Sequence, residues 1–290
     1  MYDPREFAAQ GHALGREWIQ ALPGLTAEMC RRWDLVNAGG PVHSGYRAVV
    51  RSVTQRGNRC VLKLSWPPET VATEARALRA WNGDGVVRLM DFDEEHGALL
   101  LEQLDARRTL GTLPVMSAAG VAGDVLRRLA IPSPGGFPTT QERAAGIAAT
   151  LRDRHQRCGA PIPDRFIDTA ASMAEIIAAR EGAHLLVHAD LHYGNVLGRG
   201  DRAWAAIDPK SVTGDPEHGV PELMWTRVDD VSGPSGVTQL LNTIVDAARL
   251  DPHLAMQWVV VRCVDYWLWG LEHELTEDPV RCARIVEAFC

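Results

Sequence analysis

The sequence predicts an α+β protein of two lobes, in which a small antiparallel sheet is followed by a larger, mostly helical lobe. Short β-branched segments separated by turn-forming residues fill much of the first 105 residues, a pattern typical of antiparallel strands. From Ala106 onward the apolar residues recur mainly at helical spacing. We therefore expect two domains, residues 1–105 and residues 106–290.

The first lobe begins with helical periodicity that breaks at Leu22–Gly24. Strand-like segments follow, and a helix begins near Glu69, where two prolines precede apolar residues at helical spacing. We expect the strands within 33–40, 46–53, 58–66, 86–92 and 98–104, with this helix after the third strand.

The second lobe carries helical periodicity with one exception, the stretch 185–210. Two short apolar runs in that stretch each end near a carboxylate, so we expect a strand, a loop and a second strand there. We expect helices over roughly 115–130, 139–158, 164–181, 221–228, 235–250 and 253–275.

Composition places the chain among ordinary globular proteins, with 46% hydrophobic and 23% charged residues. The N-terminal segment lacks the pattern of a secretory signal, and no apolar run is long enough to cross a bilayer. The six cysteines form no C-x-x-C pair, so we expect reduced thiols and no zinc site. We expect a cytoplasmic monomer or weak dimer that binds neither a membrane nor nucleic acid.

Charge is unevenly distributed along the chain. Residues 211–290 hold 13 acidic and 5 basic side chains, a balance of −8, whereas residues 1–210 are at +1. Such a field repels nucleic acid and favours cations. The alternative is a solvated acidic surface that only aids solubility.

Histidines near the 185–210 stretch raise the possibility of a metal hydrolase. His184, His188 and His192 are four residues apart, but in a strand and loop this spacing does not align the imidazoles as a helix would. No H-E-x-x-H pattern completes a zinc shell. A zinc hydrolase is therefore a poor candidate.

Phosphoryl transfer fits the same stretch better. His188, Asp190 and Asn195 reproduce the spacing H-x-D-x-x-x-x-N of a kinase catalytic loop. Asp208 follows thirteen residues after Asn195, and a hairpin of that length returns it beside the asparagine. The two side chains can then hold Mg²⁺, while Asp190 meets the acceptor hydroxyl.

The first lobe supplies matching parts in the expected order. Lys63 lies in the third strand, as a phosphate-binding lysine does, and Glu74 in the next helix can orient it. Glu69 is the rival partner, although a carboxylate in a first helical turn often only complements the dipole. The segment Gly39–Gly45 lies where a phosphate-covering loop belongs, so Gly45 is a candidate nucleotide contact; a plain hairpin turn is the alternative. The segment 98–105 would connect the lobes and offer backbone groups to adenine.

These motifs resemble a known family. The segments "LLVHADLHYGNVL" and "WAAIDPKSVTGDP" are similar to the aminoglycoside phosphotransferases, in particular the aminoglycoside/hydroxyurea antibiotic resistance kinases that include streptomycin 6-phosphotransferases. The resemblance runs from about Leu35 to Arg227. It implies a two-lobed protein-kinase-like fold, ATP or GTP with Mg²⁺, and O-phosphorylation of a small molecule.

The resemblance also implies residue roles. Asp190 matches the catalytic base, and Asn195 and Asp208 match the metal ligands. The nucleotide contacts carried over are Lys63 with its partner Glu74, and the backbone of Glu102 and Leu104. His188 matches a histidine that supports the loop, and His192 receives no role.

Two positions depart from the family pattern. Ala189 replaces a glycine, which we expect to be tolerated if Ala189 does not adopt a positive φ. Gly219 stands where the family usually has an acidic residue. That departure puts the loop near the acceptor pocket in doubt, and with it the usual acceptor.

The acidic last quarter of the chain is a candidate acceptor site. In the helix 254–275, one stripe mixes carboxylates with indoles, which together attract cations. That stripe consists of Trp258, Arg262, Asp265, Trp269 and Glu272; the alternative is an exposed face whose carboxylates pair with Arg262. The segment Glu222–Asp230 is a second candidate wall, with Asp229 and Asp230 as its candidate residues. The alternative is that these two are simply surface charges.

The sequence therefore predicts an ATP-dependent phosphotransferase that modifies a hydroxyl of an aminoglycoside-type antibiotic, first of all a streptomycin-like one, and so confers resistance. A kinase of another basic hydroxylated compound, such as a peptide antibiotic, a sugar or an amino alcohol, is the nearest alternative. A pseudokinase that only binds nucleotide is a second, but intact Asp190, Asn195, Asp208 and Lys63 disfavour it.

Overall fold

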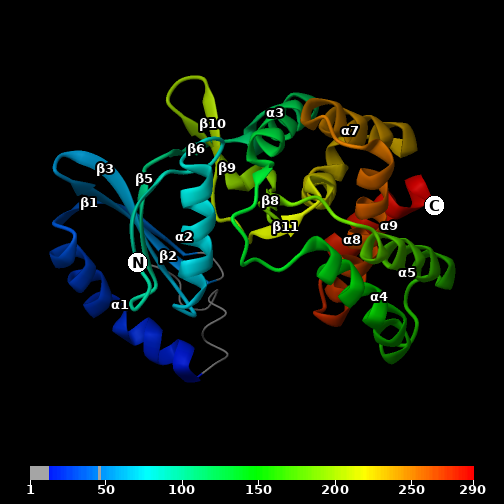
Figure 1. Ribbon diagram of the computed structural model, residues 1–290, viewed down its shortest axis with the longest axis horizontal. Coiled ribbons are helices and arrows are strands. Elements are labelled where there is room, and N and C mark those ends of the chain that lie inside the picture. Colours follow the sequence, from blue (N-terminus) through cyan, green and yellow to red (C-terminus); the bar gives the residue numbers. More distant parts are fainter. Residues whose placement is uncertain (1–12, 45–46) are drawn as a thin grey trace. The chain divides into compact units, whose positions relative to one another are not determined.

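A computed structural model describes residues 13–44 and 47–290. It divides into two compact units, Met1–Asp105 and Ala106–Cys290 (Figure 1). The first contains an antiparallel sheet and the second is mostly helical, so the predicted α+β class is confirmed. No helix in the described ranges is both long and apolar enough to span a membrane.

A five-stranded sheet forms the centre of the first unit, in the order β1-β2-β3-β5-β4. Each neighbouring pair is antiparallel. The strands are β1 (Leu35–Ser44), β2 (Ala48–Gln55), β3 (Asn58–Ser65), β4 (Leu89–Asp93) and β5 (Ala98–Glu102). β1 continues through most of the segment expected to be a turn, with a register shift between Asn37 and Val42. Gly45, the candidate nucleotide contact, lies outside the described residues.

Helix α1 (Ala13–Arg32) runs through Pro23 without a break, so the interruption expected at Leu22–Gly24 is wrong. A proline inside a helix costs about 3 kcal/mol. However, one face of α1 packs on the sheet, where Trp18, Leu22 and Met29 are buried together with Leu62 and Leu64 of β3. This packing holds the helix together across the proline.

Helix α2 (Thr70–Trp81) covers the other face of the sheet. Successive side chains of a strand point to opposite faces, so Lys63 faces away from its neighbours Leu62 and Leu64, which pack with α1. On that opposite face Lys63 meets Glu74 of α2. The helix begins where the sequence predicted it, with Glu69 at its N-cap.

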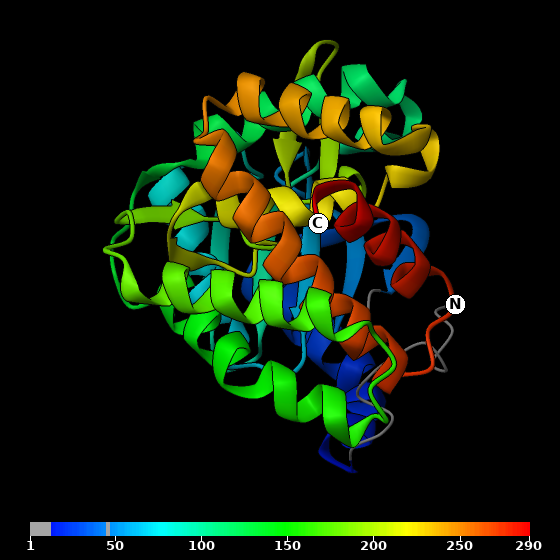
Figure 2. The same ribbon diagram turned by 90° about the vertical axis from the view of Figure 1, so that its right-hand side faces the viewer.

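The second unit is built from packed helices. Figure 2 shows α4 and α5 side by side, with α8 against α5 and α9 against α8. The helices are α3 (Val115–Leu129), α4 (Thr140–Arg157), α5 (Asp164–Ala179), α6 (Val220–Trp225), α7 (Gly233–Ala248), α8 (Pro252–Glu272) and α9 (Glu277–Phe289). The sequence predicted all of these except α9.

Two small sheets frame the functional loop of the second unit. One has the order β10-β9-β6 and the other the order β11-β8-β7. Their strands are β6 (Asp105–Thr109), β7 (Ile131–Pro132), β8 (Leu185–Val187), β9 (Val196–Arg199), β10 (Ala203–Ala206) and β11 (Val212–Gly214). The chain from β8 to β11 therefore contains the two predicted strands, β8 and β10. It also contains two strands that were not predicted, β9, which pairs with β10, and β11, which pairs with β8.

Candidate active site

His188 links the two ends of the functional loop. It follows β8, its side chain is fully buried, and its Nε2 donates a hydrogen bond to the carbonyl oxygen of Ile207 at 3.0 Å. In return, the N–H of Lys210 donates to the carbonyl oxygen of His188 at 2.9 Å. Burial lowers the pKa of His188 to about 3, so the ring is neutral near pH 7. His188 therefore supports the loop rather than exchanging protons.

Ala189 adopts a positive φ of 59°. The condition under which alanine was expected to be harmless is therefore not met. A non-glycine residue in the left-handed region costs about 1–2 kcal/mol, although the residue is also buried in a small apolar cluster with Val187 and Val212. The backbone here retains the conformation that suits glycine even though the residue is alanine.

Asn195 holds the main chain at Asp190. Its Nδ2 donates to the carbonyl oxygen of Asp190 at 2.9 Å. The β9–β10 hairpin pairs Val196 with Ala206, and the N–H of Ile207 donates to the carbonyl oxygen of Asn195 at 2.8 Å. Asp208 follows at once, so the hairpin does return this carboxylate to the asparagine, as its length predicted.

A cation already lies on Asp208. The Nζ of Lys210 is 2.9 Å from Asp208 Oδ1. Because the amide nitrogen of Asn195 faces Asp190, its carbonyl oxygen is directed elsewhere and can bind a metal. One carboxylate and one amide oxygen fit Mg²⁺, which in kinases completes its shell with phosphate oxygens and water. The donor set of these residues therefore suits the predicted ion.

Asp190 lines a cavity of about 390 Å³ in the second unit. His192, Glu222, Trp225, Arg262 and Tyr266 line it as well, together with Asp278 and Arg281 of α9. Burial first, and then the charge of Glu222, raise the pKa of Asp190 to about 7, while Lys210 opposes the shift. A carboxylate with such a pKa can accept a proton near neutrality.

Glu222 and Arg262 form a buried ion pair beside Asp190. Arg262 Nη2 donates to Glu222 Oε1 at 2.6 Å, and the side chains are 17% and 6% exposed. Arg262 Nη1 lies 3.1 Å from Nε2 of the fully buried His218. Burial, assisted by the charge of Arg262, holds the pKa of His218 well below its usual value. The neutral ring therefore accepts this hydrogen bond.

Aromatic rings form another part of the cavity wall. Trp225 and Tyr266 stack with centroids 4.7 Å apart, and Trp269 stacks on Tyr266 at 5.5 Å. The Tyr266 hydroxyl donates to Asp278 at 2.8 Å. Arg262 lies over the Trp225 ring, 5.6 Å from its centroid, so a cation of the protein itself already contacts this ring.

In the first unit, Lys63 and Glu74 form a buried ion pair. Lys63 Nζ lies 2.8 Å from both carboxylate oxygens of Glu74, and the side chains are 8% and 9% exposed. Glu69, the rival partner, is exposed at the start of α2 and makes no side-chain cap. The structure therefore places Glu74, and not Glu69, on the lysine.

The end of β5 limits how adenine could be contacted. The N–H of Glu102 donates to the carbonyl oxygen of Arg88 at 3.0 Å, and the Glu102 carboxylate accepts from the Arg88 N–H at 2.7 Å. A backbone contact of Glu102 with adenine would therefore fall to its carbonyl oxygen. Leu104 is two residues further along and partly buried.

Comparison with known proteins agrees with these motifs. The model of the aminoglycoside/hydroxyurea antibiotic resistance kinases matches residues 32–273. The chain belongs to this family. It is 37% identical to a hydroxyurea phosphotransferase of Kitasatospora aureofaciens, covering 96% of this chain and 82% of that protein. It is 36% identical to a streptomycin 6-kinase of Streptomyces glaucescens, and the match covers 92% of this chain and 88% of that protein. The predicted family is thereby confirmed, and the protein is a small-molecule kinase.

A solved structure confirms the fold of this family in the chain. The crystal structure of aminoglycoside phosphotransferase APH(4)-Ia has a TM-score of 0.64 at 17% identity, and the match covers 92% of this chain and 99% of that one. The predicted two-lobed kinase-like fold is therefore shown.

The acceptor residues predicted for this kinase do not line the cavity of Asp190. Asp265 and Glu272 both pair with Arg154, at 2.6 and 2.7 Å, and not with Arg262 as the alternative expected. Trp258, assigned to the same stripe, is fully buried. Trp269 reaches the cavity only by stacking on Tyr266, which itself lines it.

The two carboxylates singled out in the second predicted acceptor wall also form ion pairs with arginines. Asp229 pairs with Arg281 at 2.6 Å and approaches Arg284 at 3.8 Å. Asp230 pairs with Arg227. These carboxylates hold α9 and the chain before α7 in place, and neither lines the cavity of Asp190.

The departure at Gly219 has a packing reason. A Cβ at this position would lie 2.9 Å from Cδ1 of Leu126 on α3, so a larger residue would require the Leu126 side chain to move. Acidic residues lie on either side: Glu217 accepts from the N–H of Asp251 at 3.0 Å before α8, and Glu222 faces the cavity. The kinase therefore presents its carboxylate to the cavity three residues after Gly219.

His192 acquires a local role. Its Nδ1 accepts from the N–H of Gly194 at 3.1 Å and so caps the short 3₁₀ turn that ends at Asn195. Burial lowers the pKa of the ring, which keeps it neutral and able to accept.

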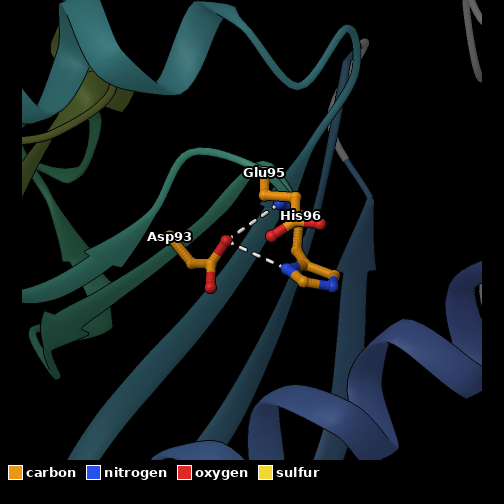
Figure 3. A group of neighbouring side chains, drawn as sticks. All are labelled: Asp93, Glu95 and His96. Atoms are coloured by element: carbon orange, nitrogen blue, oxygen red, sulfur yellow. Dashed lines mark hydrogen bonds and ion pairs between the residues drawn. The ribbon is translucent and has the colours of Figure 1, made fainter.

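A further acidic cluster, at the β4–β5 turn, has a structural explanation. Figure 3 shows Asp93, Glu95 and His96 close together. Asp93 Oδ1 accepts from the His96 N–H at 3.0 Å and from its Nδ1 at 2.9 Å, while Oδ2 pairs with Arg32 at 2.6 Å. Because both oxygens are engaged, one of them by a cation, we read the cluster as a cap of the turn rather than as a metal site.

Sequence reasoning missed Lys210 and the contributions of α9 to the cavity, and within the predicted wall Glu222–Asp230 it singled out Asp229 and Asp230 rather than Glu222. Lys210 follows the proposed metal ligand by two residues, and this proximity was an available signal. Glu222 could not be recognised, because its position opposite Asp190 depends on how α6 packs against α8. Asp278 and Arg281 belong to the helix that was not predicted.

Proposed function

We propose that this kinase transfers the γ-phosphoryl group of ATP, with Mg²⁺, to a hydroxyl of a cationic antibiotic of the streptomycin type. One observation carries the proposal: the Asn195 amide holds the backbone of Asp190, and the β9–β10 hairpin returns Asp208 to that asparagine. A base and a pair of metal ligands are thus fixed in one short segment. The identity to a streptomycin 6-kinase supports the choice of acceptor.

Each residue has a proposed part in the transfer. Asp190 accepts the proton of the attacking hydroxyl, and its raised pKa of about 7 suits that task. Asn195 and Asp208 hold Mg²⁺, which when bound neutralises charge on the phosphate oxygens. Lys63, fixed by Glu74, binds the α- and β-phosphates. Positioning and electrostatics, rather than covalent catalysis, then lower the barrier.

Binding of adenine would use the end of β5, through the carbonyl oxygen of Glu102 and the backbone of Leu104. GTP is the second candidate phosphoryl donor. Backbone groups distinguish adenine from guanine only by whether they donate or accept each hydrogen bond. Gly45, which lies outside the described residues, remains a proposed nucleotide contact.

Hydroxyurea is the second candidate acceptor. The 37% identity to a hydroxyurea phosphotransferase favours it, and its N–OH group is a hydroxyl that the same chemistry can phosphorylate. The cavity of about 390 Å³ is much larger than hydroxyurea needs, and this size favours the larger acceptor.

Mass spectrometry of candidate acceptors tests the proposal. The purified protein is incubated with Mg²⁺, ATP or GTP, and streptomycin, hydroxyurea, another aminoglycoside, a basic peptide antibiotic or an amino alcohol. We expect streptomycin to gain one phosphate with the native chain and not with Asp190→Asn. Asp201→Asn is the matched control, because Asp201 is exposed at the tip of the same hairpin. Phosphate on none of these compounds would refute the proposed function.

A further inference from the structure

Glu222 has no part in the proposed phosphoryl transfer, although it lies beside the proposed base. It lines the same cavity as Asp190, and its side chain is only 6% exposed. Oε1 accepts from Arg262, but Oε2 is buried without a hydrogen-bond partner in the part of the chain that is described. A buried oxygen left unpaired costs about 1–3 kcal/mol, and more when it carries charge. The arrangement therefore provides an acceptor for one more hydrogen bond.

Arg262 is not placed to satisfy this second oxygen. One of its terminal nitrogens bonds to Glu222 Oε1 and the other to His218. His218 is neutral and buried, so it accepts from Nη1 of the guanidinium, and Nη2 alone bonds to the carboxylate. Arg262 and Glu222 are therefore joined by one hydrogen bond rather than by a bidentate pair, and one carboxylate oxygen of Glu222 is left unused.

The remaining wall of the cavity favours a group that carries N–H donors. Trp225 and Tyr266 present stacked rings, and Tyr266 donates its own proton to Asp278. Arg281, the other cation of the wall, is engaged by Asp229 and Asp278. Arg262 already lies over the Trp225 ring, 5.6 Å from its centroid, so the unused carboxylate oxygen of Glu222 is the group left to attract an ammonium or guanidinium group.

We propose that Glu222 determines acceptor specificity by accepting a hydrogen bond from a nitrogen of the acceptor close to the hydroxyl that is phosphorylated. The chain would then select amino-, guanidino- or amide-bearing hydroxyl compounds over analogues that lack this nitrogen. This inference rests on the proposed function and narrows its substrate class. Glu222 is a recognition residue in this scheme, and the proton of the hydroxyl still goes to Asp190.

A matched pair of acceptors tests the proposal on the native chain. One member is an aminocyclitol and the other is the corresponding inositol, which has a hydroxyl in place of the amino group. We expect kcat/KM to be at least tenfold higher for the aminocyclitol. Equal values for both members would overturn the inference while leaving the phosphotransferase activity intact.

Substitution at Glu222 provides the second test. Glu222→Gln keeps the oxygen that Arg262 binds but presents an NH₂ group to the acceptor, so we expect the discrimination to disappear. The loss should fall on KM for the nitrogen-bearing acceptor, with KM for ATP unchanged. Glu222→Asp should restore part of the discrimination.

Glu217→Gln is the matched control for this substitution. Glu217 is a second buried glutamate, five residues earlier, whose carboxylate accepts from the Asp251 N–H and does not line the cavity. We expect this variant to keep the native discrimination, with thermal unfolding confirming that all variants fold. Unaltered discrimination in Glu222→Gln would overturn the assignment of Glu222. If the native chain phosphorylates none of the acceptors, the proposed function fails and the inference falls with it.

Discussion

Ala189 shows how a single residue can carry backbone strain within a functional loop. Its φ of 59° suits glycine, whereas its methyl group is buried with Val187 and Val212. Replacing Ala189 by glycine therefore relieves about 1–2 kcal/mol of strain but gives up buried apolar surface. At Ala205, a buried residue of β10, the same change brings no relief.

We predict that Ala189→Gly is less destabilising than Ala205→Gly by about 1–2 kcal/mol. The free energies of unfolding in urea measure this difference directly. Equal losses at the two positions would mean that the backbone at Ala189 is not strained.

Buried histidines make stability depend on pH. Burial lowers the pKa of His188 to about 3 and holds that of His218 well below its usual value, whereas in the unfolded chain a histidine titrates near 6.5. As the pH falls below about 6.5, the unfolded chain binds protons that the folded chain does not. Stability is therefore complete above that pH and decreases below it, by up to about 1.4 kcal/mol per pH unit for each histidine.

We predict that His218→Gln reduces the loss of stability between pH 7.5 and pH 5.0 by about 2 kcal/mol. Urea unfolding at the two pH values, compared with the native chain, provides the measurement. His253→Gln, at an exposed position on α8, serves as the control. An identical pH dependence in the native chain and the His218 variant would contradict the prediction.

At the scale of elements, α2 and β3 are joined by the pair Lys63–Glu74. Removing one partner of a buried ion pair leaves an uncompensated charge and costs about 3–5 kcal/mol. We therefore predict that Glu74→Ala lowers the free energy of unfolding by about 3 kcal/mol and decreases kcat/KM for ATP. Glu69→Ala, on the exposed first turn of the same helix, should change neither quantity appreciably. If the Glu74 variant bound ATP with native affinity, Glu74 would have no role in nucleotide binding.

Two carboxylates of helix α8 stabilise the fold and are not expected to bind the acceptor. Glu272 and Asp265 share Arg154, so they join α8 to α4. We predict that Glu272→Gln leaves the acceptor KM unchanged and costs about 1 kcal/mol of stability or less. Steady-state kinetics together with thermal unfolding provide the test, and a large increase in the acceptor KM would favour the site that the sequence predicted.

The elements show which features a sequence reveals. Strands β2 to β5 and most of the long helices were predictable because local pattern and final burial agree, whereas the five-residue strand β6 was not predicted. The break in α1 was predicted wrongly, because packing of Trp18, Leu22 and Met29 on the sheet outweighs the local effect of Pro23. Helix α9 was missed, and two- or three-residue strands such as β7 and β11 depend on partners distant in the chain.

The candidate site divides in the same way. Asp190, Asn195 and Asp208 could be found because phosphoryl transfer requires fixed residue types at fixed spacing within one segment. The acceptor cavity draws on α6, α8 and α9, and no spacing within one helix reveals which carboxylates meet an arginine. Glu222 was therefore not singled out within the predicted wall Glu222–Asp230, while the more conspicuous Asp265 and Glu272 were chosen on α8.

For the whole molecule, the excess negative charge of the last quarter serves mainly to join elements. Many of its carboxylates pair with arginines, as Asp229 does with Arg281 and Glu272 does with Arg154. Glu222 differs because one of its oxygens remains unpaired within the described structure. The proposed function also draws on both compact units, since Lys63 belongs to the first and Asp190 to the second.

The most direct test of the account is a single-turnover transfer from γ-³²P-labelled ATP to streptomycin in the presence of Mg²⁺. We predict that the native chain and Asp201→Asn label the antibiotic at equal rates, whereas Asp190→Asn binds ATP but labels it at least a hundredfold more slowly, in line with the loss of a general base. Equal rates in the native chain and Asp190→Asn would show that Asp190 is not the base and would contradict the central claim.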